Sequence, residues 1–457
     1  MKNKQIIIII VLIFVNLYVK SQNYLTNSEI KTLIIQEVDK GRTPSLIVGT
    51  INKNDEFIFG YGKPFSKNDN QPNENTIYEI GSITKIFVTT IFADMILKNE
   101  IGLNDPISKF LPDTLSLPKI NGQDITLKHL ATHTSGFDKM PKSYYNLEKE
   151  DAHQFYKNFD KADMYKYLNS LNSVDSSRWE YSNVGISLLA HILCLKEKCD
   201  FNTLIQDRIC KPLNMTSTTT IVKSKDYDRY ATPYIGIGRE VAPYEYKILE
   251  GAITLKSTTS DLLKFLKGAF IDDTDINKAV KYATKIQIKK TKYPHTSLGL
   301  GWFIYDDGKD KIYSHGGKTS GFISFIGYDE TNNIGIVLLS NSLADIDDIA
   351  LHILNKDNKI KDISRKIIEI DDTTFNKVAG KYLLSEKDTI IVDSKNKQYY
   401  IHFSRQGDFE MFPTKENKFY VKTPFIDIFF EDFQSNHYNI LIIDPKKRNI
   451  KAKRIIK

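Results

Sequence analysis

The 457-residue sequence contains few cysteines, namely Cys194, Cys199 and Cys210. Their spacing lacks the paired C-x-x-C of a zinc site, and neither a metal nor another cofactor is expected. One pair can form a disulfide if the chain is exported, but three cysteines cannot all pair within one molecule. We therefore expect these side chains to have a structural role and no catalytic one.

The sequence also lacks a block of one charge. Its 63 Lys and Arg residues exceed its 56 Asp and Glu residues by a formal net charge of +7, which is spread along the chain. The basic stretch Lys446–Arg454 alternates with apolar residues, a pattern that favours a solvated edge strand over a nucleic-acid-binding surface. A nucleic acid is therefore not an expected partner.

Long apolar runs are equally scarce. The run Ile6–Val19 follows Lys2 and Lys4 and is short for a bilayer span, but it suits the apolar part of a secretory signal. We expect residues 1–21 to be a signal peptide, so that the mature protein is periplasmic or secreted and has no stable membrane span. An uncleaved membrane anchor is the alternative.

Apolar patterning divides the rest of the chain into two parts. Residues 27–355 begin and end with strand patterns and show helical spacing between them, which predicts an α/β domain with an antiparallel sheet and an inserted helical region. After a charged linker at 356–373, short apolar runs separated by polar turns predict a small all-β barrel or sandwich over 374–457. In the first domain, strands are expected at 46–51, 57–61, 300–305, 311–315, 322–328 and 334–340.

A first chemical motif, Gly81-Ser82-Ile83-Thr84-Lys85, begins an apolar helix predicted up to Leu97. Positions i and i+3 share a helical face, so the Ser82 hydroxyl and the Lys85 amine can meet. A serine hydroxyl is a weak nucleophile until a base takes its proton, and lysine can be that base once burial lowers its pKa. Taken alone, the S-x-x-K pattern equally fits a helix cap and a surface lysine.

A second motif is Tyr181-Ser182-Asn183. In an extended loop, residues two apart point the same way, so the side chains of Tyr181 and Asn183 can enter one cleft. A tyrosine near a lysine can share its proton and act as base and then as acid. Asn183 can donate to a substrate carbonyl and hold the lysine. The alternative is a surface turn with Tyr181 packed on the core.

A third motif, His315-Gly316-Gly317-Lys318, falls on a late strand. Small residues let a substrate backbone lie against the strand edge. His315 can hydrogen-bond to a polar group or a terminal carboxylate of the ligand. Near its ordinary pKa of about 6.5, this side chain would be partly protonated at neutral pH. Taken alone, the stretch also fits an ordinary glycine-rich turn.

In this order, the three motifs resemble the β-lactamase-like serine hydrolases, in particular their class C β-lactamase, DD-peptidase and esterase branch. The resemblance covers residues 27–355. The C-terminal part is similar to the small lipocalin-like β domain found in many such hydrolases. Connecting segments similar to the family are Gly102–Pro106, Ile125–Phe137, Lys211–Met215 and Ser257–Phe265.

The resemblance implies that Ser82 is the acyl-forming nucleophile and that Lys85 and Tyr181 shuttle its proton. Asn183 would position the substrate. The backbone N–H groups of Ser82 and Lys318 would form the oxyanion hole, with the Lys318 side chain in solvent. The H-G-G sequence departs from the K-T-G of the superfamily, whose lysine helps hold the carboxylate of a β-lactam. Efficient β-lactamase activity is therefore not expected.

The expected function is acyl transfer to water through a Ser82 ester, on D-amino-acid peptides of the cell-wall type or on small esters. A broad carboxylesterase and a catalytically idle protein that binds peptidoglycan peptides are the alternatives. A pure binding protein has no need of the complete set of Ser82, Lys85 and Tyr181. His129 and His133 are spaced like the zinc ligands of H-E-x-x-H, but Leu130 replaces the glutamate, so a structural turn is expected there.

Overall fold

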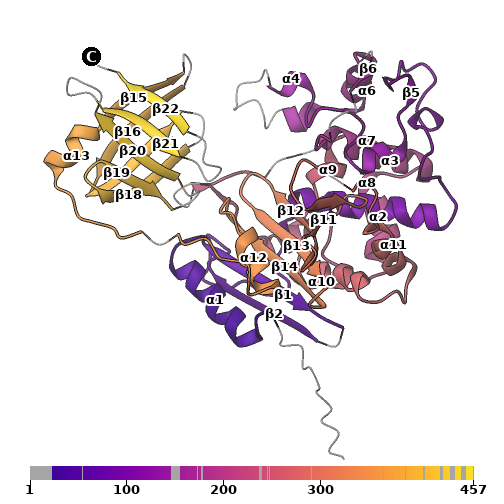
Figure 1. The fold of residues 1–457 in the computed structure, drawn as a ribbon, viewed down its shortest axis with the longest axis horizontal. Coiled ribbons are helices and arrows are strands. Elements are labelled where there is room, and N and C mark those ends of the chain that lie inside the picture. Colours follow the sequence, from indigo (N-terminus) through magenta and orange to yellow (C-terminus); the bar gives the residue numbers. More distant parts are fainter. Residues whose placement is uncertain are drawn as a thin grey trace, which may run out of the picture.

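The computed structural model describes residues 23–455, with gaps at 54, 146–154, 172, 176–178, 236–238, 244, 246, 290, 364, 386–387, 405–406, 423–425, 433–437 and 444–448. The expected signal peptide therefore lies outside the described residues. Within the described part, no helix has the length and apolar character needed to cross a membrane. The chain forms an α/β part and a separate β-barrel at the end of an extended connection (Figure 1).

An antiparallel sheet of seven strands, in the order β10-β11-β12-β13-β14-β1-β2, lies at the centre of the α/β part. The early hairpin and the three late strands from residue 311 form where the apolar pattern predicts them. The chain's early and late segments meet where β1 pairs with β14, with Val48 opposite Leu338. The strands are β1 (Ser45–Ile51), β2 (Glu56–Gly62), β10 (Thr296–Leu298), β11 (Phe303–Asp306), β12 (Lys311–Lys318), β13 (Ile323–Asp329) and β14 (Ile334–Ser340).

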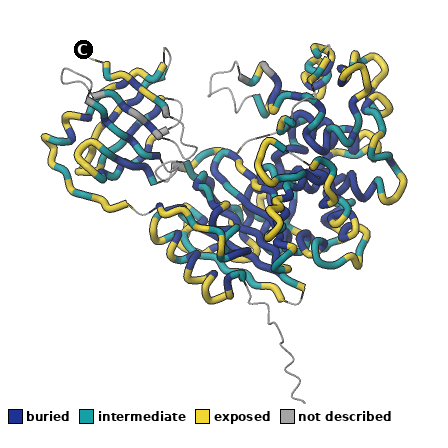
Figure 2. Tube along the Cα trace, in the orientation of Figure 1, coloured by how far each residue is buried: buried dark blue, intermediate teal, exposed yellow. Residues whose placement is uncertain are grey.

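Helices cover both faces of this sheet. On one face lie α1 (Asn27–Asp39) and α12 (Asp347–Leu354), and on the other lies α10 (Thr259–Leu266). Strands β1 and β14 are consequently buried at every position, as Figure 2 shows, and both read as continuous apolar runs. Successive residues of β1 pack into different hydrophobic cores. Val48 belongs to the core on the side of α1 and α12, and Ile47 belongs to the core on the side of α10.

The inserted helical region surrounds α2 (Thr84–Leu97). This helix packs against α7 (Asn183–Glu197), α9 (Glu250–Ile253) and α11 (Asp275–Ala283), and its residues from Thr84 to Met95 are all buried. A helix that is apolar all round must be enclosed by protein. The enclosure keeps water away from the first turn of α2, where Lys85 lies.

Shorter elements complete the α/β part. The helices are α3 (Leu127–Ala131), α4 (Lys142–Tyr145), α6 (Lys161–Asn169) and α8 (Phe201–Ile205). The short strands are β3 (Tyr78–Glu79), β4 (Lys119–Ile120), β5 (Gln123–Asp124), β6 (Ser173–Val174), β7 (Tyr234–Ile235), β8 (Arg239–Glu240) and β9 (Lys256–Ser257).

The C-terminal part is a closed barrel that follows a short helix, α13 (Asp372–Val378). Its expected all-β, lipocalin-like character is confirmed. Aromatic side chains such as Phe419 and Phe430 fill the interior, with ring centroids 5.5 Å apart. The strands are β15 (Gly380–Ser385), β16 (Asp388–Lys395), β17 (Gln398–Phe403), β18 (Gly407–Lys415), β19 (Lys418–Val421), β20 (Ile426–Asp432), β21 (Tyr438–Ile443) and β22 (Asn449–Arg454).

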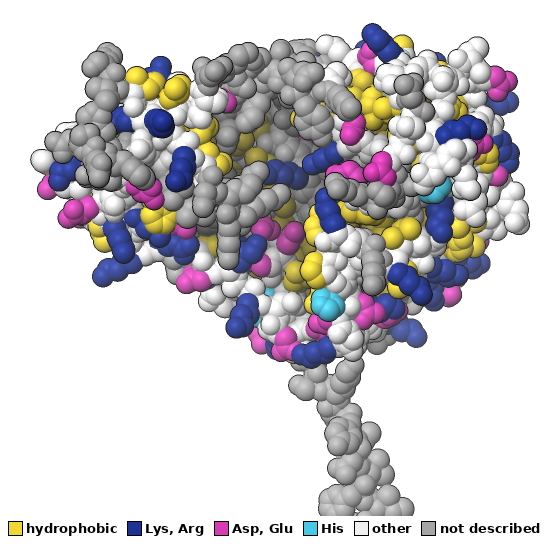
Figure 3. Space-filling view, turned by 45° about the horizontal axis from the view of Figure 1, so that its top comes forward, with side chains coloured by type: hydrophobic (Ala, Val, Ile, Leu, Met, Phe, Trp, Pro, Cys, Tyr) yellow, Lys and Arg dark blue, Asp and Glu magenta, His cyan; other side chains and the backbone are white. Residues whose placement is uncertain are grey.

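Charged side chains of both signs are interspersed over the face shown in Figure 3. Some form exposed ion pairs, for example Lys63 with Asp69 and Lys157 with Glu245. Pairs of this kind contribute only about 0–1 kcal/mol each to stability.

Candidate active site

The structure brings Ser82 and Lys85 into direct contact. A 3-10 turn, η1 (Gly81–Ile83), leads directly into α2, so that Lys85 Nζ lies 2.9 Å from Ser82 Oγ and 2.8 Å from the carbonyl oxygen of Ala252. Lys85 is completely buried, whereas Ser82 is partly exposed. Burial and the charge of Lys139 hold the pKa of Lys85 well below its usual range. A neutral Lys85 can donate to Ala252 and accept the Ser82 proton with its lone pair.

Tyr181 lies against the same two side chains. Its ring centroid is 4.9 Å from Lys85 Nζ, and its hydroxyl interacts with Ser82. Burial raises the pKa of Tyr181, and the contact with Ser82 opposes that shift only in part. Tyr181 is therefore a neutral phenol in the free protein, which can donate a proton, while the neutral amine is the available base.

The Tyr181-Ser182-Asn183 segment is not extended throughout, contrary to the sequence-based expectation. Ser182 is the N-cap of α7, with its Oγ accepting the Gly185 N–H at 2.9 Å, and Asn183 is the first residue of the helix. Serine is a preferred N-cap residue because its hydroxyl oxygen accepts a backbone N–H of the first turn, which explains why the loop changes to a helix here. The motif is therefore held by a helix terminus.

Asn183 does not hold the lysine as expected. Its Nδ2 lies 3.5 Å from the sulfur of Met140, and its buried Oδ1 has no hydrogen-bond partner among the described residues. Its backbone N–H donates to the carbonyl of Lys139 at 3.0 Å. This leaves the side-chain oxygen available for a substrate N–H.

His133 makes three contacts with the tyrosine segment. Its carbonyl accepts the N–H of Glu180 at 3.2 Å, and its Nδ1 accepts the N–H of Ser182 at 3.1 Å. Between these two bonds, the imidazole ring lies 4.5 Å from the Tyr181 ring. Burial and the nearby Lys85 hold the pKa of His133 well below its usual range, so the ring is neutral.

Sequence reasoning interpreted this histidine only as part of a turn. His133 has a φ of 57°, a conformation that histidine, asparagine and aspartate adopt more readily than other side chains. His129 belongs to a different contact, since its Nδ1 accepts the N–H of Thr126 at 3.1 Å. The two histidines therefore do not act as a pair. The signal that could have identified His133 is its place in the His133-Thr134-Ser135-Gly136 segment.

The third motif provides an open strand edge. Strand β12 pairs with β13 as far as Lys318, but its pairing with β11 ends at Ser314. The Thr319 N–H donates to the carbonyl of Phe322, on the side of β13. Backbone N–H groups alternate between the two sides of a strand in an antiparallel sheet, so those of Gly316 and Lys318 point to the side opposite β13. A substrate strand can pair with that edge.

This edge lies directly against the nucleophile turn. A Cβ atom at Gly317 would lie 2.0 Å from the carbonyl oxygen of Ile80, and one at Gly81 would lie 2.6 Å from the backbone nitrogen of Lys318. Only glycine permits both approaches, and Gly81 also has a φ of +51°. The backbone nitrogen of Lys318 is consequently beside the turn that carries Ser82, while the Lys318 side chain is exposed.

His315 is buried and neutral, so its expected partial protonation at neutral pH is wrong. Burial, with a contribution from Lys85, lowers its pKa to about 3. Its Nδ1 lies 2.7 Å from the carbonyl oxygen of Gly316, and since a carbonyl only accepts, Nδ1 carries the proton. The buried Nε2 has no partner among the described residues and presents a lone pair. In this tautomer, Nε2 can accept a hydrogen bond but cannot donate one to a carboxylate.

Aromatic rings that sequence reasoning did not assign to the site complete its wall. Phe303 lies 5.4 Å from the His315 ring and 6.4 Å from the Tyr181 ring, measured between centroids. Trp179 packs on Phe303 at 6.0 Å. Trp179 could have been assigned to the site from the sequence, because it lies just before the second motif. Nothing in the local sequence distinguishes Phe303 from a core residue.

The three cysteines lie outside this wall and carry free thiols. Cys194 and Cys199 are partly buried near the end of α7, and Cys210 is buried. Burial raises the pKa of the Cys210 thiol to about 12, which makes it a poor nucleophile.

Comparisons with known proteins give a consistent result. The family profile described as Beta-lactamase matches residues 30–356. A penicillin-binding protein of Bacillus subtilis (strain 168) is 26% identical over 403 residues, which cover 81% of this chain and 86% of that protein. The D-alanyl-D-alanine-carboxypeptidase/endopeptidase AmpH of Escherichia coli (strain K12) is 26% identical over 302 residues, covering 62% of this chain and 76% of that one.

Solved structures share the fold. A penicillin-binding protein homologue from Pyrococcus abyssi, described as octameric, has a TM-score of 0.60 at 21% identity and covers 94% of this chain and 100% of its own. The D-alanine carboxypeptidase AmpC from Burkholderia cenocepacia has a TM-score of 0.60 at 22% identity, covering 72% of this chain and 98% of its own.

Proposed function

The chain belongs to the beta-lactamase family and is a serine hydrolase, and we propose that it hydrolyses D-amino-acid peptides of the cell-wall type or small esters through an acyl-enzyme on Ser82. The observation that carries the proposal is the 2.9 Å contact between Ser82 Oγ and a desolvated Lys85. The relatives named as a penicillin-binding protein and a D-alanyl-D-alanine carboxypeptidase support the peptide substrate class.

In the proposed acylation step, Ser82 Oγ attacks the substrate carbonyl carbon and its proton passes to the neutral Lys85. The negative charge that develops on the carbonyl oxygen is held by the backbone N–H groups of Ser82 and Lys318. Tyr181, as a neutral phenol, donates a proton to the leaving group, and the proton on Lys85 restores the tyrosine. Water then attacks the ester, and the same groups transfer its proton back to Ser82.

Labelling with a fluorophosphonate or a penicillin, followed by mass spectrometry of the peptides, tests this proposal. A single adduct on Ser82 supports the acyl-enzyme, and absence of an adduct with both reagents would reject it. The relative labelling rates separate the two enzymatic alternatives, because a broad carboxylesterase favours the phosphonate over the penicillin. A catalytically idle binding protein would show no covalent adduct.

We also propose that the protein acts outside the cytoplasmic membrane, as a periplasmic or secreted enzyme. Support comes from the signal-like residues 1–21, which lie outside the described part, and from relatives named as a penicillin-binding protein and a D-alanyl-D-alanine-carboxypeptidase/endopeptidase. Within residues 27–373, the α/β domain and its linker carry every proposed catalytic group, and the barrel from 374 onward carries none of them.

His133 is proposed as a positioning residue for Tyr181, because it accepts from the residues on both sides of the tyrosine and its ring packs on the tyrosine ring. His133→Ala should lower kcat about a hundredfold with a small change in KM, whereas His133→Asn should recover about tenfold of that loss. Asparagine tolerates the positive φ and places an acceptor where Nδ1 stood. The measurement is steady-state hydrolysis of a p-nitrophenyl ester.

His129→Ala is the control for this series, since His129 caps a neighbouring helix and should keep the wild-type kcat. Equal losses of kcat in the alanine and asparagine variants of His133, with wild-type folding by circular dichroism, would show that the acceptor does not position Tyr181.

A further expected result concerns β-lactams. The wild-type protein should hydrolyse p-nitrophenyl acetate, while turnover of nitrocefin should be slow or absent. The physical reason is that a neutral His315, whose buried Nε2 carries a lone pair and no charge, stands where the superfamily has a lysine that helps hold the β-lactam carboxylate. Because the pKa of His315 is about 3, KM for a carboxylate-bearing substrate should not change with pH around neutrality through this group. Nitrocefin turnover comparable to that of an efficient β-lactamase would contradict this account.

A further inference from the structure

Cys194 and Cys199 lie on either side of the turn that ends α7. Lys198 has a left-handed conformation, with a φ of 56°, and turns the chain so that the Cys199 N–H donates to the carbonyl of Cys194 at 3.2 Å. A bond from the sixth residue back to the first is typical of the Schellman motif at helix ends. The side chains at the two ends of this motif commonly contact each other, and here both are cysteines.

The same hydrogen bond places the two cysteines within reach of a disulfide. Two cysteines can be bridged without backbone movement when their Cα atoms are less than about 7 Å apart. Standard bond lengths and the N···O distance of 3.2 Å limit the separation of these two Cα atoms to roughly 7 Å even along a straight path, and the turn bends that path. A disulfide here therefore requires rotation of two side chains and little movement of the backbone.

The surroundings of the three cysteines separate this pair from the third. Cys194 and Cys199 are both partly exposed and line the same surface cavity. Cys210 is buried and is not among the residues that line this cavity, and its Sγ lies 4.0 Å from the carbonyl oxygen of Thr218. An oxidant in solution can therefore reach the first two thiols, while Cys210 is protected from it.

The protonation of the pair fits a structural disulfide better than a catalytic one. Burial raises the pKa of Cys194, and the nearby Cys199 raises it further. Burial also raises the pKa of Cys199, together with the charge of Glu197. Catalytic and redox-sensing cysteines need a lowered pKa, which neither residue has. A sulfur with a raised pKa is also a poor leaving group, so a disulfide between these two residues exchanges slowly once it has formed.

We propose that Cys194 and Cys199 form a structural disulfide in an oxidising compartment and that Cys210 remains a free thiol. The structure, with three free thiols, represents the reduced form. The oxidant is itself a disulfide, either that of a thiol–disulfide oxidoreductase or oxidised glutathione. One cysteine attacks a sulfur of the oxidant and releases a first thiol, and the other cysteine then attacks the mixed disulfide and releases a second. The pair loses two protons and two electrons, and the oxidant becomes two thiols.

The disulfide joins the end of α7 to the start of α8. Asp200, directly after Cys199, is the N-cap of α8 and accepts the N–H of Thr203 at 2.9 Å. The other end of α7 begins at Ser182, within the second motif, so the cross-link restrains the helix that carries this motif. Because the cross-link lowers the entropy of the unfolded chain, the melting temperature of the oxidised protein should exceed that of the reduced protein by about 2–5 °C.

Thiol counting in the full-length protein tests the proposal. The folded protein is first reduced, then equilibrated with an excess of oxidised over reduced glutathione, and finally denatured and treated with N-ethylmaleimide. We expect an adduct on Cys210 alone, whereas the protein kept reduced should carry adducts on all three cysteines. Trypsin cleaves after Lys196 and Lys198, between the two cysteines of the pair, so their disulfide appears in the digest as two linked peptides.

Two variants provide the controls, and none of these measurements depends on the chemistry of Ser82. Cys210→Ala should retain the linked peptides and the difference in melting temperature, whereas Cys199→Ser should lose both. Adducts on all three cysteines of the oxidised wild-type protein, a disulfide that includes Cys210, or a stable glutathione adduct on Cys194 or Cys199 overturns the proposal. Equal melting temperatures of the oxidised and reduced forms, with the linked peptides present, overturn the structural role of the disulfide.

Discussion

Ser82→Ala should abolish covalent labelling and reduce turnover of every substrate to the uncatalysed background, the largest effect expected for any single change. The alanine removes the only atom that forms a bond to the acyl group, so Lys85 and Tyr181 have no serine proton to transfer. Ester hydrolysis and intact-mass spectrometry after fluorophosphonate treatment measure the two losses, and circular dichroism checks the fold.

Ser320→Ala provides the matched control. Ser320 follows β12 close to the open edge, and its hydroxyl donates to the carbonyl of Ala242. No lysine amine contacts it among the described residues, so this variant should label at the wild-type rate. An adduct on another serine in the Ser82→Ala protein would show that the nucleophile has been wrongly assigned.

The contact between Ser82 and Lys85 could be predicted from the sequence because it is local. Two residues three apart at the start of a helix necessarily share a face, and the apolar residues that follow predict burial of that face. The fold class followed from a similar argument, since strand patterns at the two ends of the domain and helical spacing between them predict an antiparallel sheet with an inserted helical region.

The contacts of His133 could not be predicted in this way. Its Nδ1 meets Ser182, 49 positions along the chain, and such a pairing depends on how α3 and α7 pack. The protonation state of His315 is also a property of the folded protein, because burial and the Gly316 carbonyl together determine it. Sequence alone gave the residue type and an ordinary pKa.

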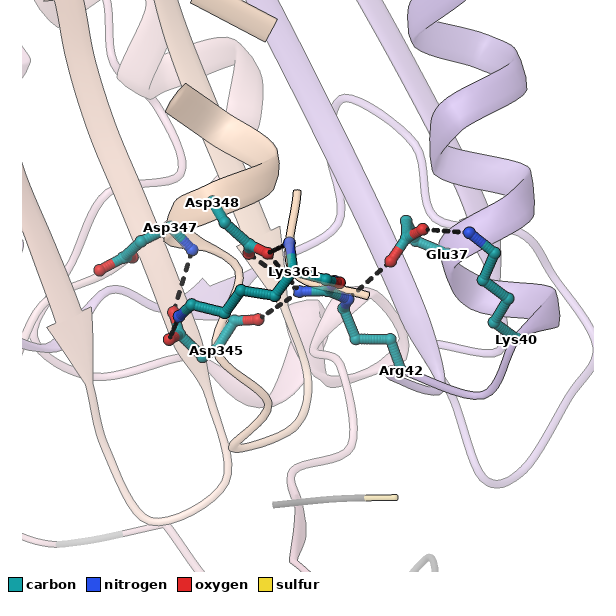
Figure 4. A network of polar contacts seen from close by, with 7 residues as sticks. All are labelled: Glu37, Lys40, Arg42, Asp345, Asp347, Asp348 and Lys361. Atoms are coloured by element: carbon teal, nitrogen blue, oxygen red, sulfur yellow. Dashed lines mark hydrogen bonds and ion pairs between the residues drawn. The ribbon is translucent and has the colours of Figure 1, made fainter. Parts of the chain in front are cut away.

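Asp347 illustrates a third kind of limit. The sequence Asp345-Ile346-Asp347-Asp348 places three acidic residues close together, which is a common pattern at helix N-termini. Only the structure shows that Lys361 and Arg42 neutralise two of them (Figure 4) and that the third faces Gly316.

Replacing the two proton-transferring residues should separate their roles. Lys85→Met should lower kcat/KM by on the order of 10² to 10⁴ for all substrates, since the base that activates Ser82 is lost. Tyr181→Phe should cost as much for alkyl esters and amides, but less for p-nitrophenyl esters, whose leaving group departs without a proton. The double variant should lose less than the product of the two single losses, because both residues serve one proton path.

The pH dependence gives a second measurement on the same variants. Only neutral Lys85 can accept the Ser82 proton, and burial places its pKa below the usual range. In the wild-type protein, kcat/KM should therefore rise as pH increases through that lowered pKa and then level off. The rising limb should disappear in Lys85→Met and persist in Tyr181→Phe.

Lys256→Met is the control for burial of a lysine. Lys256 is also buried, donates to the carbonyl of Thr220 at 2.9 Å, and has a pKa that burial lowers. It contacts no nucleophile among the described residues, so its replacement should disturb packing to a similar degree yet keep both kcat/KM and its rising limb.

Multiplicative losses in the Lys85 and Tyr181 double variant would show that the two residues act on separate steps, and an unchanged pH profile in Lys85→Met would show that another group is the base.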